Sequence, residues 1–100
     1  MKTQDLKGKK LLVLGGTALV CDIVAKAKDM GIYTIVTDWN DPSASPAKKI
    51  ADEYWMESIS NTTKLAQLIK ENNIDGIITN YTDSYLPFYA RLCESTGLPC

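Results

Sequence analysis

The sequence predicts a three-layer α/β domain with a parallel β-sheet, and three observations lead to this prediction. Short apolar stretches alternate along the chain with segments of helical periodicity, which is the pattern of repeated βα units. The first stretch, Leu11 to Leu14, is continuously apolar, as expected for a strand covered on both faces. That strand leads directly into Gly15, Gly16 and Thr17, where a chain can turn sharply before a helix. Strands that alternate with helices favour a parallel sheet with right-handed crossovers, and the expected strand order is 3-2-1-4, half of a doubly wound sheet.

The size and composition of the chain are those of a single globular domain, residues 1–100, or of a piece of a larger one. The formal net charge of -1 provides no electrostatic attraction for nucleic acid or for an anionic membrane, so neither is an expected partner. No apolar stretch reaches the roughly 20 residues that span a bilayer. Residues 1–10 also lack the apolar core of a signal peptide. The expected compartment is therefore the cytoplasm.

The chain contains no histidine, which excludes Ser-His and Cys-His nucleophile systems and histidine metal ligands. Its three cysteines, Cys21, Cys93 and Cys100, are odd in number and far apart, unlike a disulfide framework or a zinc site. Apolar neighbours at helical spacing favour core positions for Cys21 and Cys93. We therefore predict no catalytic residue and no metal site in this chain.

The elements after the first strand follow in order. Apolar residues recur at helical spacing from Val20 to Met30, and Gly31 has the residue type favoured just after a helix. The β-branched stretch from Ile32 to Thr37 predicts a second strand that ends at Asp38. The first βα unit is thus followed by a second strand without a long connection.

A turn-rich connection from Asp41 to Pro46 comes next. Ser45 and Pro46 fit the N-cap and the first position of a short helix that continues to about Ala51. Tyr54 to Met56 then predicts a brief third strand. The second crossover therefore contains only a short helix.

The third crossover helix begins at a cap, Ser60 or Asn61, and ends at Asn72 and Asn73. Ile74 to Thr79 predicts the fourth strand. These elements complete the four-stranded sheet.

The last helix is predicted from about Ser84 to Thr96, with Pro87 in its first turn, where N–H groups lack helical partners, and with Gly97 as its stop. A fifth strand at the carboxyl end is missing, and residues 76–79 carry no lysine or proline to protect the outer edge of the fourth strand. Either further polypeptide supplies a fifth strand, or a second chain covers this edge in a homodimer.

Ligands of such sheets bind outside the carboxyl ends of the strands, near the point where the strand order reverses. The turn after the first strand favours a carboxylate or a phosphate there, because turn N–H groups and the helix amino end attract anions. The dinucleotide fingerprint is not met, because Thr17 and Val20, or Ala18 and Cys21, occupy its other glycine positions. The candidate substrate-binding residues on this edge are Gly15, Gly16, Thr17, Asp38, Thr82, Asp83 and Ser84.

Several of these residues have an alternative structural role. Asp38 lies where a ribose-binding acid would lie, and it could equally bind a polar substrate or form an Asx turn. Residues 82–84 could contact substrate or only cap the last helix. Trp39 could pack at the edge of the site or provide a surface on which a ring stacks.

Three stretches together resemble the amino-terminal domain of ATP-grasp ligases, particularly the carbamoyl-phosphate synthase large-subunit-like group. They are residues 9–16 (KKLLVLGG), the segment from Asp38 through 41–47 (DPSASPA) to 50–53 (IADE), and residues 74–79 (IDGIIT) with the Gly97, Leu98 and Pro99 step. The resemblance implies a Rossmann-like, pre-ATP-grasp domain over nearly the whole chain.

The same resemblance implies an enzyme that uses ATP to activate a carboxylate as an acyl phosphate and joins it to an amine or another nucleophile. In such ligases later domains hold Mg-ATP, so this chain alone is expected to bind no cofactor and to catalyse nothing. The implied partners are the remaining ATP-grasp domains, on the same chain or on a split subunit, and a small carboxylate or amine substrate. The glycine loop is the part of this domain that would contact the substrate.

Two other functions fit the residues. The glycine turn and Asp38 are compatible with a small Rossmann-like module that senses a nucleotide and regulates a partner. The unprotected edge of the fourth strand is compatible with a non-catalytic interaction domain that dimerises. Nucleotide titration would identify the first of these functions, and sedimentation would identify the second.

Overall fold

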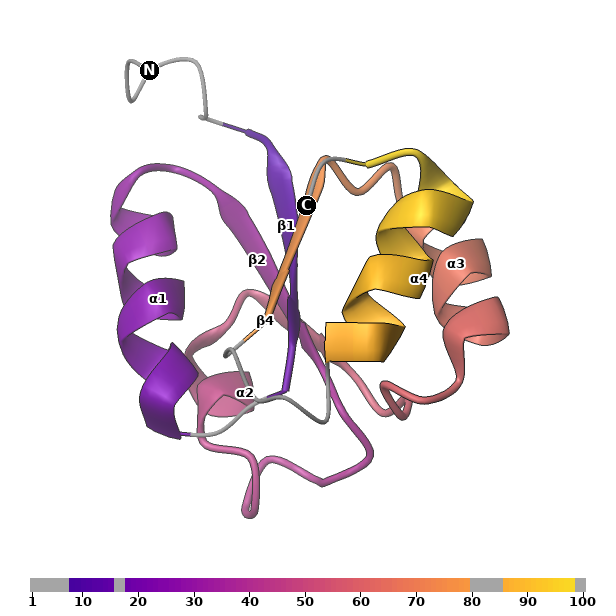
Figure 1. Cartoon of the computed structure of the whole chain (residues 1–100). Coiled ribbons are helices and arrows are strands. Elements are labelled where there is room, and N and C mark those ends of the chain that lie inside the picture. The colour runs from indigo at the N-terminus through magenta and orange to yellow at the C-terminus, as the bar shows by residue number, and fades with distance from the viewer. Residues whose placement is uncertain (1–7, 16–17, 80–85, 99–100) are drawn as a thin grey trace.

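The computed structural model of the chain describes residues 8–15, 18–79 and 86–98. Four parallel strands form one sheet in the order β3-β2-β1-β4 (Figure 1). The strands are β1 (Lys10–Leu14), β2 (Tyr33–Thr37), β3 (Glu53–Trp55) and β4 (Gly76–Thr79). The predicted fold class and strand order are therefore confirmed.

Helices cover both faces of the sheet and complete the three layers (Figure 1). Helices α1 (Ala18–Asp29) and α2 (Ala47–Ile50) lie on one face, and α3 (Thr62–Glu71) and α4 (Leu86–Thr96) lie on the other. Successive strand residues point to opposite faces, so an apolar run such as β1 is buried on both. The first face buries Val13, Val20, Val24, Val36 and Ala47. The larger cluster on the second face includes Leu12, Leu14, Ile35, Leu65, Ile77 and Leu92.

Two helices end with the same left-handed turn. After α1, Gly31 has a φ of 82°, and the N–H of Ile32 donates to the carbonyl of Ala27 at 3.0 Å. After α3, Asn73 has a φ of 55°, and the N–H of Ile74 donates to the carbonyl of Ile69 at 3.1 Å. Ile74 thus closes the helix, and β4 begins at Gly76 and not at Ile74 as predicted.

The start of α2 also differs from the prediction. The helix begins at Ala47, and Pro46 occupies its N-cap position without a side-chain hydrogen bond. The hydroxyl of Ser45 donates instead to Oδ2 of Asp38 at 2.8 Å. The prediction that Ser45 caps this helix is wrong, because a buried carboxylate from the preceding strand end binds the hydroxyl. For α3 the structure selects Asn61 as the cap, whose Oδ1 accepts from the N–H of Lys64 at 3.4 Å.

The α4 helix carries Pro87 as its second residue, in the first turn, as predicted. Its predicted start at Ser84 lies outside the described residues. Cys93 of α4 is buried, as expected for a core position, and it is also disulfide-bonded, which the cysteine spacing did not lead us to expect. In the described part of the chain, no helix has the length and apolar character needed to cross a membrane.

Two strands form the edges of the described sheet, β3 and β4. The β4 edge is the one that the sequence analysis considered for a homodimer. On the β3 edge, the carboxylate of Glu53 accepts from the Tyr33 hydroxyl at 2.9 Å and from Nε1 of Trp55 at 2.6 Å. The shared carboxylate ties the beginning of β2 to both ends of β3.

This contact affects the titration of Tyr33. Its hydroxyl donates to Glu53, and the negative charge of Glu53 disfavours the phenolate, so the pKa of Tyr33 lies above its ordinary value of 10.0. The hydrogen bond stabilises the fold below pH 10 and is lost as the pH rises through the raised pKa. We expect Glu53→Gln to bring the titration of Tyr33 back towards about 10. The measurement is the phenolate absorbance of each protein minus that of its Tyr33→Phe counterpart. A matched Glu57→Gln variant should leave the midpoint unchanged, and an unchanged midpoint in Glu53→Gln would contradict the assignment.

Candidate functional site

The carboxyl ends of the four strands are joined by hydrogen bonds. The N–H of Gly15 donates to the carbonyl of Thr37 at 2.9 Å, which connects the ends of β1 and β2. The hydroxyl of Thr37 donates to the carbonyl of Glu57 at 2.8 Å, just beyond β3. The hydroxyl of Thr79 donates to the carbonyl of Leu14 at 3.5 Å and connects β4 to β1. This edge, where the sequence places the site, is therefore held together by threonine hydroxyls as well as by the sheet.

Gly15 has a backbone conformation that requires glycine. Its φ of 93° lies in a region that residues with a side chain rarely adopt, and it allows the chain to leave β1 abruptly. Because its N–H already binds Thr37, this group is not available to a ligand. The neighbouring candidates Gly16 and Thr17 lie outside the described residues, as do Thr82, Asp83 and Ser84.

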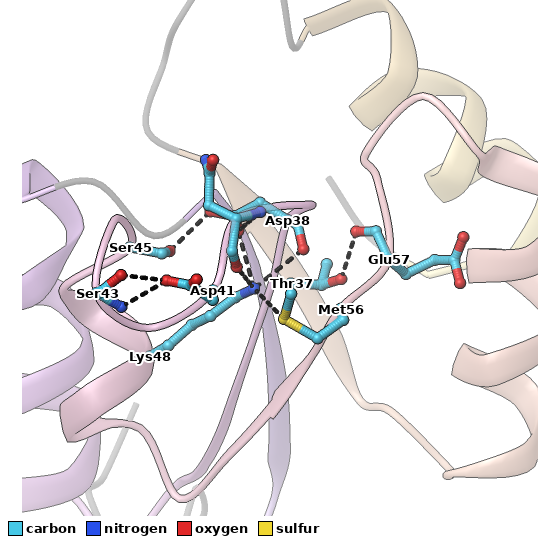
Figure 2. Close-up of polar contacts among 9 residues, drawn as sticks. Thr37, Asp38, Asp41, Ser43, Ser45, Lys48, Met56 and Glu57 are labelled. Carbon is cyan, nitrogen blue, oxygen red and sulfur yellow. Dashed lines mark hydrogen bonds and ion pairs between the residues drawn. The ribbon is translucent and has the colours of Figure 1, made fainter.

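Asp38 lies at the end of β2 and is 5% exposed. Its Oδ1 accepts from the N–H of Asn40 at 2.9 Å, which is an Asx turn, and its Oδ2 accepts from the hydroxyl of Ser45. Oδ1 also lies 2.9 Å from Nζ of Lys48, with which it forms an ion pair (Figure 2). Of the alternatives for Asp38, the Asx turn is thus present, and substrate contact stays a prediction.

Lys48 is the residue of this site that the sequence analysis missed. It lies on α2, and its side chain is fully buried. Besides the ion pair, Nζ donates to the carbonyl of Asp38 at 3.0 Å and to the carbonyl of Asn40 (Figure 2). The same Nζ lies 3.3 Å from Sδ of Met56 and 5.5 Å from the ring centroid of Tyr54. A single ammonium group therefore organises the loop that follows β2.

The rest of this loop is ordered by a second short motif. Asp41 Oδ1 accepts from the N–H of Ser43 at 2.9 Å and also from the Ser43 hydroxyl (Figure 2). These hydrogen bonds favour the carboxylate and hold the pKa of Asp41 below its ordinary value. The loop that carries Asp38 and Trp39 is therefore anchored at two points before α2 begins.

Trp39 follows Asp38 directly in this loop and is 72% exposed. The sequence allowed two roles for Trp39, packing at the edge of the site or stacking on a ring. The described residues do not cover it, whereas Trp55 on β3 packs against the larger buried cluster. Exposure of this kind could not be read from residue type, because tryptophan is usually well buried.

The described residues offer no metal site and no incomplete polar site. They contain no group of three or more His, Cys, Asp or Glu side chains placed to hold a metal ion. Each of their buried side-chain nitrogen and oxygen atoms has a hydrogen-bond partner. We assign to the described residues no chemical step through Mg-ATP.

Two surface hollows lie at the opposite end of the sheet. One, of about 280 Å3, is lined by residues at the amino ends of β1 and β4, including Lys10 and Asp75. The other, of about 410 Å3, lies beside the amino end of β2 and includes Lys28 and Tyr33. Neither hollow contains a predicted site residue, and Lys10 Nζ already donates to the carbonyl of Asn72 at 3.0 Å. The hollows are thus separate from the candidate site.

No family model matches the chain, but comparisons with single proteins identify relatives. The formate-dependent phosphoribosylglycinamide formyltransferase of Sulfurisphaera tokodaii is 38% identical over 71 residues, which are 71% of this chain and 17% of that protein. The nitrogenase iron-molybdenum cofactor biosynthesis protein NifE of a Nostoc species is 29% identical over 92 residues, covering 87% of this chain and 19% of that protein.

Solved structures extend this comparison. The phosphoribosylglycinamide synthetase of Anaerococcus prevotii superposes with a TM-score of 0.76 and 34% identity, covering 91% of this chain and 23% of that one. The chain spans about a fifth of the length of the relatives it matches. The homologues include ATP-grasp ligases, and the chain corresponds to their amino-terminal, Rossmann-like domain, which confirms the resemblance seen in the sequence.

Proposed function

We propose that this chain is the substrate-side domain of an ATP-dependent carboxylate–amine ligase and that it is not catalytic alone. The observation that carries the proposal is the 34–38% identity of the chain to two relatives whose names both contain phosphoribosylglycinamide. The strand order 3-2-1-4 agrees with it. In such a ligase the other domains bind Mg-ATP and activate the carboxylate. This domain forms one wall of the cleft in which the amine attacks.

The proposed substrate is a small molecule with a phosphate or a carboxylate. Support comes from the position of Gly15, Gly16 and Thr17 in the chain, directly between β1 and α1, because a helix amino end and free N–H groups favour an anion. Thr82, Asp83 and Ser84 follow the adjacent strand and are proposed to contact the same molecule. Asp38 is proposed to help position this edge, since both of its oxygens already have protein partners.

The role proposed for Asp38 also bears on the alternative function of nucleotide sensing. A ribose-binding acid at the end of β2 needs a carboxylate that can accept from sugar hydroxyls. Here Lys48, Ser45 and the N–H of Asn40 occupy that carboxylate. We therefore favour the ligase domain over the nucleotide-sensing module.

The proposal is tested with two proteins. The isolated chain is expected to show no saturable heat of Mg-ATP binding in calorimetry and no release of ADP, because in such a ligase the other domains bind Mg-ATP. In the second protein, this chain replaces the matching segment of the Sulfurisphaera tokodaii formyltransferase. We expect that chimera to formylate phosphoribosylglycinamide with formate and ATP.

The control is the same formyltransferase with the matching segment deleted and nothing inserted, which should be inactive. Micromolar affinity of the isolated chain for Mg-ATP would contradict the proposal, and so would a folded chimera without activity.

A further inference from the structure

Three exposed apolar residues lie around the buried ammonium of Lys48, Met56 and Tyr54 through their side chains and Trp39 through its place in the backbone. Trp39 is 72% exposed, Met56 54% and Tyr54 44%, and they are three of the five large apolar residues that the described chain exposes. Met56 Sδ lies 3.3 Å from Lys48 Nζ, and the Tyr54 ring centroid lies 5.5 Å from it. Trp39 is the residue between the two whose carbonyls accept from the same Nζ. We call Trp39, Tyr54 and Met56 the Lys48 patch.

The backbone that carries Trp39 is fixed before any partner arrives. Lys48 binds the carbonyls on both sides of Trp39 and the carboxylate of Asp38, so the segment 38–40 curls around one ammonium (Figure 2). Burying a lysine is costly unless it is paired, and here the ion pair holds an exposed tryptophan in place. Tryptophan, tyrosine and methionine are enriched in protein interfaces, and a preorganised aromatic side chain is the usual centre of such an interface.

The patch offers apolar surface and no net charge. The Lys48 side chain is fully buried and neutralised by Asp38, so it cannot attract an acidic partner. Its ammonium contacts Met56 Sδ, the Tyr54 ring and the two carbonyls that flank Trp39, and the three residues of the Lys48 patch carry no charge of their own. The complementary partner is therefore an apolar, uncharged protein surface and not an anionic ligand.

The area of the Lys48 patch indicates what kind of protein surface binds it. The three side chains expose on the order of 300 Å2, given the area of aromatic side chains. A stable complex of two separate proteins buries roughly 800 Å2 on each partner. The Lys48 patch is too small to hold two copies of this chain together. It suits one contact among several between domains of a larger enzyme, where attachment raises the effective concentration.

From these observations we propose that the Lys48 patch is a docking surface for the other domains of the ligase, and this inference rests on the proposed function. Trp39 is its central anchor, Met56 and Tyr54 flank it, and Lys48 is the positioning residue that fixes all three. The surface is distinct from the outer edge of β4, which lies at the opposite side of the sheet.

Hydroxyl-radical footprinting of the isolated chain and of the chimera with the formyltransferase tests this directly. We expect the oxidation rates of Trp39 and Met56 to be at least about fivefold lower in the chimera than in the isolated chain, because the centre of an interface excludes water. Tyr33 is the matched control, since it is similarly exposed, at 37%, but lies at the amino end of β2, whereas Trp39 follows the carboxyl end of the same strand. Its oxidation rate should not change.

A second measurement covers the case in which the chimera does not fold. Here the chain is added to the formyltransferase that lacks its matching segment, and binding is followed by calorimetry. Trp39→Ala should weaken the association by roughly 30-fold or more, the effect of one central anchor, whereas Tyr33→Ala should leave it unchanged.

The other outcomes separate the docking surface from its alternatives and from the proposed function. Unprotected Trp39 and Met56 in a folded chimera would overturn it, as would the absence of association in the second experiment. Protection that already exists in the isolated chain at high concentration would assign the patch to a second copy of the chain instead. Catalysis by the chimera with an unprotected patch would leave the proposed function standing and reject only this inference. Protection of the patch in a chimera without catalysis would support the docking surface and contradict the proposed function.

Discussion

Lys48→Ala is expected to lower the free energy of unfolding by about 3–5 kcal/mol, the loss seen when one partner of a buried ion pair is removed. The variant leaves the carboxylate of Asp38, 6% exposed, without its cation, and it leaves the carbonyls of Asp38 and Asn40 without a donor. A domain of this size has a total stability of only about 5–15 kcal/mol. The melting temperature should therefore fall by more than about 12 °C.

Urea unfolding followed by far-ultraviolet circular dichroism measures this loss. The matched control is Lys49→Ala, the exposed neighbour on the same helix, which should change stability by less than about 0.5 kcal/mol. If Lys48→Ala proves too unstable to purify, the double variant Lys48→Met with Asp38→Asn removes both charges and should recover part of the loss. A change below about 1 kcal/mol in Lys48→Ala would show that the pair behaves like a surface salt bridge and would contradict the structure.

Leu12→Ala is expected to lower the free energy of unfolding by about 2.7–5 kcal/mol, the range for replacing a fully buried leucine in a packed core by alanine. Leu12 is 0% exposed and lies in the central strand, in register with Ile35 of β2 and Ile77 of β4. All three point towards α3 and α4, so alanine at this position opens a cavity at the centre of the larger cluster. Little relaxation is possible, because hydrogen-bonded strands flank it on both sides.

The matched control is Leu86→Ala at the beginning of α4, where the leucine is 41% exposed. It should cost less than about 1 kcal/mol, since it removes little buried area. Urea midpoints of the two variants, measured under the same conditions, make the comparison. Equal losses for Leu12 and Leu86 would mean that the described sheet is not the core of the domain.

Most of the fold could be predicted because its signals are local. The apolar run of β1, the helical spacing from Val20 to Met30 and the glycine at position 31 each concern residues within one turn or strand. The strand order was expected from the doubly wound arrangement that alternating strands and helices commonly adopt. The errors arose where a distant partner competes with a local one. Ser45 binds Asp38 and does not cap α2, and Ile74 closes α3 and does not begin β4.

The candidate site was predictable only in its location. The sequence by itself determined that Gly15 and Asp38 end adjacent parallel strands and hence lie on one edge, because strand ends and turns are encoded by neighbouring residues. Only the tertiary structure decided that Asp38 is paired with Lys48 and that Trp39 faces solvent. Lysine is almost always exposed, so nothing local distinguishes Lys48 from Lys49. The distinction comes from the short helix α2, which packs its first turn against the sheet and brings one ammonium within reach of the loop.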